Sequence, residues 1–165
     1  MPPLKILRYP EAILTGVSRP VKRVGYEERI LLDNMLETMY LNQGVGLAAP
    51  QVGVPRRAIV VDVGEGPICL VDPAIVKRSG REVGQEGCLS LPETMVEVKR
   101  AAKIIYRGLD REGRPVESEA EGLLGRAIQH EIDHLDGKLI IDYANPIKRI
   151  FIKRRLIEAS RTKTS

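Results

Sequence analysis

The chain has 165 residues, 43% of them hydrophobic but only 4% aromatic, so we expect one catalytic domain (residues 1–165) with a core of aliphatic side chains and methionine. Its net charge of +4 comes wholly from residues 147–165, where seven Lys and Arg stand against one Glu; the rest is slightly acidic. No apolar run approaches the roughly 20 residues of a membrane-spanning helix and no secretory signal is visible, which excludes a membrane protein and predicts a cytoplasmic one, with an organellar location left open.

Helix and strand patterns alternate irregularly along the chain. Residues 26–43 carry apolar side chains at intervals of four, which predicts an amphipathic helix. A second helix is expected over residues 121–135, with Gly137 as its stop signal, and a basic C-terminal helix over residues 145–161. Strands are predicted where β-branched runs meet turn residues, at 57–63, 67–73, 95–100, 138–143, and twice within 102–121 around a turn at 110–115. This order predicts an α+β fold, with antiparallel or mixed sheets packed around the second helix.

The two cysteines have different surroundings. Without an export signal, a disulfide between Cys69 and Cys88 is not expected. Cys69 lies in the apolar run PICLVDP and is predicted to be a small core residue. Cys88 lies in GQEGCLSLPE, among glycines and polar residues, which favours an accessible thiol.

The stretch IQHEIDHLDG holds both histidines of the chain. Residues four apart on a helix differ by about 40° in direction and about 6 Å along the axis, so His130 and His134 project from one face and can bind one metal ion. Glu131 lies about 100° round the helix from His130, where a carboxylate can take a proton from water beside the metal. The H-E-x-x-H pattern therefore predicts a metal site with a general base, the alternative being two helical histidines without a ligand.

A catalytic site of this kind needs a third protein ligand and an open position for water. Cys88 is the best candidate, because a thiolate binds Zn or Fe strongly and EGCLS offers it on a turn-prone segment. The alternatives are the acidic residues after the helix: Asp136, Asp142 and Glu158. Cys69 as a fourth ligand would close the site, but its apolar surroundings argue against that role.

The stretch GVGLAAPQ, residues 44–51, follows the first helix. Its glycines permit the close approach of another backbone, and the Gln51 amide can donate to a developing oxyanion. Taken alone, the stretch is better explained by a helix cap and a tight turn. A phosphate-binding loop is excluded, because the third glycine and a following Lys-Ser/Thr are missing.

Three stretches, GVGLAAPQ (44–51), EGCLS (86–90) and QHEIDH (129–134), together resemble the signature motifs of the peptide deformylase family, in the same order. The resemblance implies a hydrolase that removes the formyl group from the N-terminal formyl-methionine of newly synthesised proteins. It implies N-formylmethionyl nascent peptides as partners, and neither a membrane nor DNA. It also implies one divalent metal ion, natively Fe²⁺ in many members, although the ligands also suit Zn²⁺, Ni²⁺ or Co²⁺.

The resemblance implies roles for individual residues. The positions that match metal ligands are Cys88, His130 and His134. The groups that match those acting on the formyl amide are the acid/base Glu131 and two oxyanion donors, Gln51 and the backbone N–H of Leu89. The pair that matches an ion pair supporting the site is Glu86 and Arg100. The positions that match the strand-like binding of the peptide backbone are Val45, Gly46 and Gly87.

The methionine pocket is expected to have Leu123 and Ala127 among its walls. Two residues depart from the family pattern. Leu91 stands where Val or Ile is more usual, and Arg126 lies near the pocket, where other members can be apolar. We expect the stem of Arg126 to pack there while its charge reaches water. These departures leave the side-chain preference open, but not the reaction.

The basic segment 147–165 has two interpretations: a helix with a solvated charged face, or a surface that docks on ribosomal RNA. Two other functions remain in competition for the whole chain. A zincin-like endopeptidase would have a carboxylate or histidine as third ligand, and a metal-stabilised RNA-binding module would have a closed site with four ligands.

Overall fold

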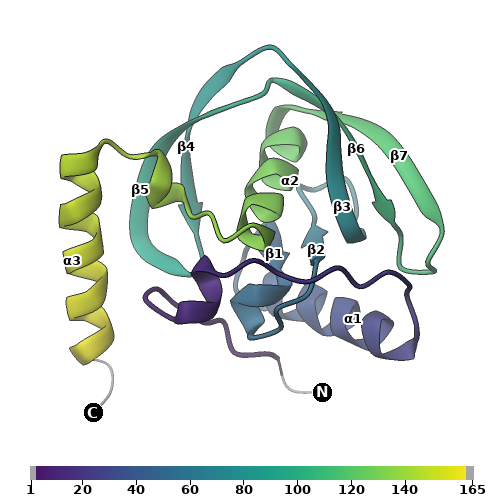
Figure 1. The fold of residues 1–165 in the computed structure, drawn as a ribbon, viewed down its shortest axis with the longest axis horizontal. Helices are drawn as coiled ribbons and strands as arrows, with labels where there is room; N and C mark the ends of the chain where they lie inside the picture. The colour runs from purple at the N-terminus through teal and green to yellow at the C-terminus, as the bar shows by residue number, and fades with distance from the viewer. Residues whose placement is uncertain (1–2, 163–165) are drawn as a thin grey trace.

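The computed structural model describes residues 3–162 (Figure 1). Its α-helices are α1 (Tyr26–Leu41), α2 (Gly122–Leu135) and α3 (Pro146–Thr162). Short 3₁₀ helices are η1 (Ala12–Thr15), η2 (Ala49–Val52) and η3 (Ile140–Tyr143). The strands are β1 (Gly46–Ala48), β2 (Ala58–Val61), β3 (Ile68–Ser79), β4 (Glu82–Cys88), β5 (Leu91–Arg100), β6 (Lys103–Leu109) and β7 (Pro115–Glu121). The last residues of the predicted basic segment, 163–165, lie outside the described part.

The strands form two antiparallel sheets. One has five strands in the order β1-β2-β3-β6-β7, and the other pairs β4 with β5. The predicted hairpin around the turn at 110–115 is confirmed by the pairing of β6 with β7. Helix α2 packs on β1, β2 and β7 (Figure 1). The fold is therefore α+β with antiparallel sheets, and among the described residues the one parallel pairing is an isolated bridge between Arg19 and Arg56.

The predicted first helix is confirmed, and it ends at Leu41. Its residues Leu32, Met35 and Met39 are fully buried, as expected for side chains three or four positions apart on one face. Tyr40 continues the four-residue spacing of apolar side chains, but it is 48% exposed, and its hydroxyl donates to Asp62 over 2.6 Å.

The segment 138–143 was predicted as a strand, and that prediction is wrong. It contains η3, whose start is fixed by the carboxylate of Asp142 accepting the Leu139 N–H over 2.9 Å. Ile140 and Ile141 are both buried. A β-branched run thus buries its side chains without a strand partner, because a local cap satisfies the backbone instead.

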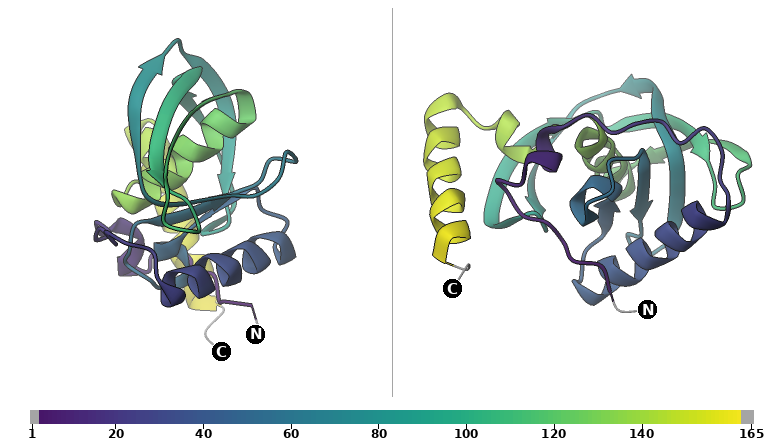
Figure 2. Two further views of the ribbon diagram at one scale, coloured as in Figure 1. Left: turned by 90° about the vertical axis from the view of Figure 1, so that its right-hand side faces the viewer. Right: turned by 60° about the horizontal axis from the view of Figure 1, so that its bottom comes forward.

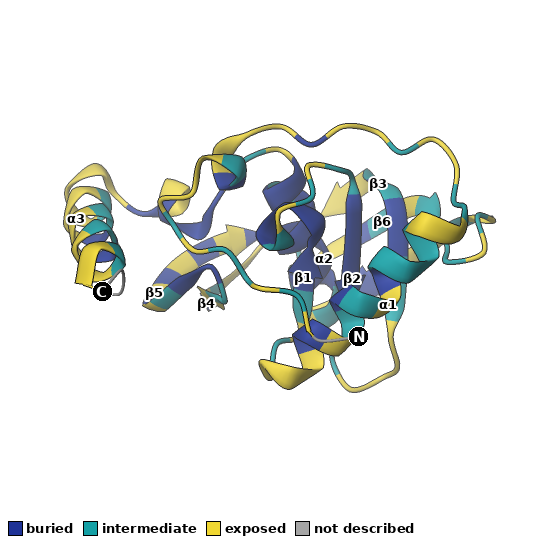
Figure 3. Ribbon diagram, turned by 90° about the horizontal axis from the view of Figure 1, so that it is seen from below, coloured by how far each residue is buried: buried dark blue, intermediate teal, exposed yellow. Residues whose placement is uncertain are grey.

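Burial divides the apolar side chains into clusters that follow the sheets. The sheet cluster joins α2 to the five-stranded sheet and includes Ile59, Ile104, Ile128 and Ile132. The hairpin cluster joins β5 to η1, η3 and α3 and contains Leu14, Leu91, Val96, Val98, Leu139, Ile140, Ile141, Ala144, Ile152 and Leu156. A third cluster packs α1 against β1, β2 and β3. Figure 3 shows the buried centre of the molecule and the mostly exposed α3.

Figure 1 and the right-hand view of Figure 2 both place α3 at one end of the molecule, beyond the β4–β5 sheet. It packs on β5 and η3. No helix in residues 3–162 is long and apolar enough to cross a membrane.

Candidate metal and hydrolytic site

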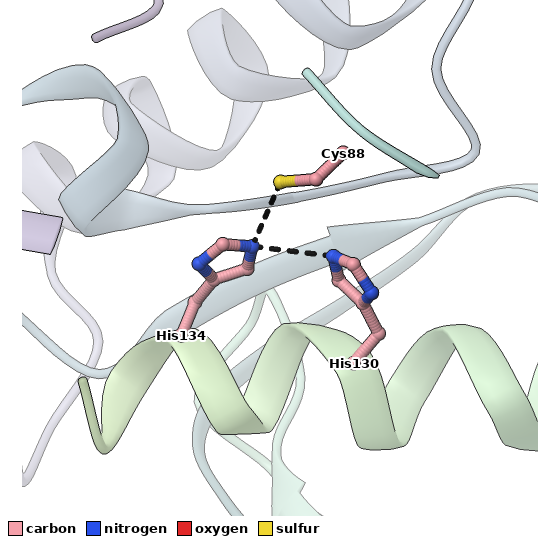
Figure 4. Close-up of side chains that lie close together, drawn as sticks. All are labelled: Cys88, His130 and His134. Atoms are coloured by element: carbon pink, nitrogen blue, oxygen red, sulfur yellow. Dashed lines mark hydrogen bonds between the residues drawn. The ribbon is translucent and has the colours of Figure 1, made fainter. Parts of the chain in front are cut away.

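Helix α2 and strand β4 bring three metal-binding side chains together. His130 and His134 project from one face of α2, and Cys88 ends β4, opposite them (Figure 4). The Nε2 atom of His134 lies 3.3 Å from the Cys88 Sγ and 3.2 Å from the Nε2 atom of His130. All three ligand atoms lie within 4.8 Å of one another. One sulfur atom and two imidazole nitrogen atoms therefore point to one place in the structure.

These spacings suit a bound divalent cation. Nitrogen and sulfur ligands at about 2.0–2.3 Å from a tetrahedral metal stand about 3.3–3.6 Å apart, close to the two shorter distances here. The charges agree. Burial opposes a charge on His130, but Glu131, Cys88 and Glu86 raise its pKa well above the usual value. Burial and the charge of His130 lower the pKa of His134 well below its usual value. The surroundings thus favour one positive charge at this point, as a cation there would provide.

Glu86 orients the first histidine. Its Oε1 lies 2.9 Å from the Nδ1 of His130, an arrangement that directs the other ring nitrogen towards Cys88 and His134. Arg100 donates to both Glu86 oxygens over 2.8 and 2.9 Å. Although burial favours the neutral acid, Arg100 and His130 hold the pKa of Glu86 well below its usual range.

The carboxyl group of Glu131 is buried in the site and only 5% of the residue is exposed. Its Oε1 has no hydrogen-bond partner among the described residues. Burial raises its pKa to about 7, in the range where a carboxylate can both accept and donate a proton near neutral pH. An unpartnered, buried carboxylate beside the metal-binding group is what proton transfer in a hydrolysis requires.

Gly46 explains how Glu131 fits there. A Cβ atom at Gly46 would overlap the Glu131 Oε2. The sequence did not predict that Gly46 leaves room for the Glu131 side chain. The predicted approach of another backbone to this glycine stays a prediction.

Gln51 faces the same point from η2. Its Oε1 accepts the Ala48 N–H over 2.9 Å, which fixes the amide orientation. Its Nε2 then points to the Ser90 hydroxyl at 3.1 Å and to the Cys88 Sγ at 3.6 Å. The side-chain amide of Gln51 thus presents donors beside the proposed ligand Cys88.

A cavity of about 560 Å³ opens onto these groups. The predicted substrate-binding positions that line it are Val45, Gly46, Gly87, Leu123 and Ala127. Glu131, Gln51, Cys88, Leu89 and His130 line it as well. The structure therefore brings to one cavity residues that are separated by up to 86 positions along the chain.

The chain was next compared with known proteins. The sequence profile of the family described as Polypeptide deformylase matches residues 3–150. A peptide deformylase from Alkalilimnicola ehrlichii is 53% identical over 157 residues, 93% of this chain and 88% of that protein. This chain belongs to the polypeptide deformylase family.

Solved structures agree with this assignment to the deformylases. A peptide deformylase from Legionella pneumophila is 41% identical and superposes with a TM-score of 0.91, over 98% of each chain. A peptide deformylase from Ehrlichia chaffeensis, in complex with actinonin, is 36% identical with a TM-score of 0.93, over the full length of both chains. Membership of this family implies a divalent metal ion, and Cys88, His130 and His134 form a group that can hold one.

The competing third ligands lie elsewhere in this deformylase. Asp136 pairs with Arg57 over 3.0 Å, and Asp142 caps η3. Glu158 lies on α3, and within residues 3–162 no fourth His, Cys, Asp or Glu joins the three-residue group. Among these described residues, the ligand sets expected of a zincin and of a closed four-ligand module are therefore not found.

The cysteines follow their predictions only in part. Neither Cys69 nor Cys88 forms a disulfide within the described chain. Cys69 is half-buried against the cluster under α1, and burial raises its pKa to about 11. Cys88 was predicted to have an accessible thiol on a turn-prone segment. It is the last residue of β4, directly before a turn at Leu89 and Ser90, and its side chain is half-buried against the hairpin cluster.

Two features of the site were not predicted from the sequence. The charge of Arg126 does not reach water: its guanidinium donates to Glu86 over 2.7 Å. Asp133 accepts from Arg100 over 2.6 Å and from the Tyr143 hydroxyl over 2.5 Å. Asp133 stood inside the H-E-x-x-H stretch, one turn from His130, and that spacing is the signal that was available for it; nothing marked Tyr143.

Proposed function

We propose that this chain is a metal-dependent amide hydrolase that removes the formyl group from the N-terminal formyl-methionine of newly synthesised polypeptides and releases formate. Membership of the deformylase family supports the reaction. The observation that carries the assignment of residues is the buried Glu131 carboxylate, whose Oε1 has no partner among the described residues. It lines one cavity with Cys88 and His130, which form a possible metal-binding group with His134.

The metal ligands are Cys88, His130 and His134 in this proposal, and Fe²⁺ is the native ion, with Zn²⁺, Ni²⁺ or Co²⁺ as replacements. When bound there, the metal supplies Lewis-acid activation of water and of the formyl oxygen. The three protein ligands leave a position for solvent, as catalytic sites require.

Glu131 accepts a proton as water attacks the formyl carbon. Its raised pKa and its lack of another partner both suit this step. Charge then develops on the formyl oxygen, where the Gln51 side-chain amide and the Leu89 N–H donate to it. Glu131 passes its proton to the nitrogen as the C–N bond breaks, which leaves formate and a free amino terminus. Arg100 and Glu86 hold His130 in its orientation throughout.

The peptide binds as an added strand between β1 and β4. Strand β1 is at the edge of its sheet, and within residues 3–162 β4 pairs with β5 alone, so both present an unpaired edge there. Val45 and Gly46 lie at one edge and Gly87 at the other. The methionine side chain enters the apolar part of the cavity beside Leu123 and Ala127.

Residues 1–165 act as a single catalytic domain in this proposal, with α2 as its central helix and residues 147–165 as an accessory segment. Its partners are N-formylmethionyl nascent chains, and it works in the cytoplasm, where these chains emerge. The ribosome is a further partner through α3, which exposes Lys148, Arg154 and Arg161 along with Phe151.

Formate release from formyl-Met-Ala-Ser, compared between the parent protein and Glu131→Gln, tests the proposal. Loss of a general acid/base costs about 10²–10⁴-fold in turnover, while the metal content should stay that of the parent. Acetyl-Met-Ala-Ser and a peptide with only internal amides serve as controls and should not be cleaved. If Glu131→Gln turned over as fast as the parent, Glu131 would not be the general acid/base. Cleavage of the internal amides would instead support the endopeptidase hypothesis.

A further inference from the structure

The ligand-bearing elements meet across a polar seam. Helix α2, which carries both histidines, buries its apolar side chains in the sheet cluster. Strand β5, the partner of the Cys88-bearing β4, buries Val96 and Val98 in the hairpin cluster. The two elements share no apolar cluster within residues 3–162, so apolar packing does not fix the distance between Cys88 and the histidines.

Polar side chains cross this seam instead. His130 contacts Glu86 of β4, and Asp133 accepts from Arg100 at the end of β5. The Gln129 amide exchanges two hydrogen bonds with the backbone of Ala101, over 3.0 and 3.1 Å. These contacts lie along the later turns of α2. The first turns depend on another side chain, Arg126.

Arg126 joins α2 to both strands of the small sheet. Its Nη1 donates to the Glu86 Oε2 over 2.7 Å and to the Val98 carbonyl over 3.0 Å. Its Nη2 donates to the Glu82 carbonyl over 3.0 Å. The guanidinium therefore has two acceptors on β4 and one on β5, and only 13% of its side chain is exposed. Lysine cannot reproduce this planar fork.

Gly84 provides the place where the guanidinium lies. A Cβ atom at Gly84 would stand 3.2 Å from the Arg126 Cζ and 3.3 Å from its Nη2. The backbone of Gly84 does not require glycine for its conformation, because its φ is not positive. Glycine at this position is thus explained by the close approach of the Arg126 head group.

The same side chain borders the substrate cavity. Arg126 lines it beside Ala127, and the strand that Arg126 holds continues to Gly87 and Cys88. Its charge is taken up by Glu86 and the carbonyls, so the guanidinium is not free to attract an acidic side chain in the cavity.

We propose that Arg126 is a positioning residue that sets the distance of β4 from α2, and hence of Cys88 from the histidines, while its stem forms a wall of the side-chain pocket. This inference rests on the proposed function for its effect on turnover. Its effect on the β4–β5 sheet and on metal affinity is independent of any peptide substrate.

Arg126→Met removes the three donors and keeps an unbranched stem. We expect metal affinity, measured by competition with a chelator using Co²⁺, to fall about 10–100-fold, as for other groups that support a ligand. In the metal-free state, the backbone amides of residues 82–88 should exchange with deuterium faster in Arg126→Met than in the parent protein. KM for formyl-Met-Ala-Ser should rise because the strand edge moves, and Arg126→Lys should fall between the parent and Arg126→Met.

Gly84→Val tests the same contact with Arg126 still present. The added side chain displaces the guanidinium, so this variant should reproduce the losses in affinity and amide protection. In the Arg126→Met background it should add less than about a further 2-fold, since coupled residues are not additive. Arg111→Met is the matched control: it removes an arginine that pairs with Asp33 away from the seam, and it should change neither readout.

Unchanged metal affinity and amide exchange in Arg126→Met would overturn the inference. So would a double variant whose loss of metal affinity equals the product of the losses in Gly84→Val and Arg126→Met. A protein that lacks deformylase activity but shows the predicted exchange pattern would contradict the proposed function and leave Arg126 as the positioning residue.

Discussion

At the scale of single residues, glycine defines the place of the proposed acid/base. Gly46 lies so close to Glu131 that a methyl group there would overlap the carboxylate. Gly44 is a useful comparison, because the one atom that a Cβ there would crowd is the movable Cδ1 of Leu89, at 2.9 Å. The Met39 Cγ and the Gly46 carbonyl oxygen would lie at ordinary contact distances of 3.5 and 3.6 Å. The two glycines of one motif therefore leave space for different side chains, Gly46 for Glu131 and Gly44 for Leu89.

Gly46→Ala should lower kcat about 100-fold, because a displacement of about 1 Å in a reacting group costs that much. Formate release from formyl-Met-Ala-Ser measures it, and metal content should be unchanged. Gly44→Ala should lose much less. If both alanine variants kept the parent kcat, Glu131 would not depend on the space at Gly46.

At the scale of elements, α3 is held to the body at few points. Ile152 and Leu156 are buried in the hairpin cluster. Arg155 donates to the Glu93 carbonyl over 2.8 Å and to the Thr94 hydroxyl over 2.6 Å, at the rim of the substrate cavity. Arg155 is therefore part of the anchoring of α3 and is unsuitable for testing the exposed cationic surface of that helix.

Reversing Lys153 and Arg154 to Glu should weaken salt-sensitive binding to ribosomes. Each phosphate contact that is lost lowers both the affinity and its dependence on salt, because fewer counterions are released on binding. Sedimentation with ribosomes at two salt concentrations measures this, and formate release from a short peptide should persist. Removal of residues after Ala159 should act in the same direction.

The matched control reverses Lys77 and Arg78, which are exposed on β3. Ribosome binding that is equally weakened by this control would show a nonspecific effect of net charge, and binding indifferent to the α3 changes would reject docking through α3.

At the scale of the whole molecule, local patterns predicted the helices well and the polar seam between α2 and the β4–β5 sheet poorly. The i, i+4 spacing in α1 and the H-E-x-x-H stretch in α2 depend on helix geometry alone, and both helices are confirmed. Strand β4 was not predicted, because its residues EVGQEGC lack apolar alternation; pairing with β5 makes it a strand.

Gln51, Cys88, His130, Glu131 and His134 could be found because three motifs carry them, and the family resemblance also gave the Glu86–Arg100 pair, which is confirmed. The contacts of Arg126 and Asp133 could not be found in that way. The partners of Glu86 come from β5 and α2, 14 to 44 positions away. Such contacts depend on how two clusters are placed against each other. The guanidinium of Arg126, expected in water, is bound by Glu86 and the Val98 carbonyl for the same reason.

The central claim is that one sulfur and two imidazoles hold a single divalent metal. X-ray absorption spectroscopy at the iron edge of the anaerobically purified protein tests it most directly. We predict one metal per chain, with one sulfur scatterer from Cys88 and two imidazoles from His130 and His134, and loss of the sulfur signal in Cys88→Asp. A spectrum without sulfur, or with four protein ligands around the metal, would contradict the account.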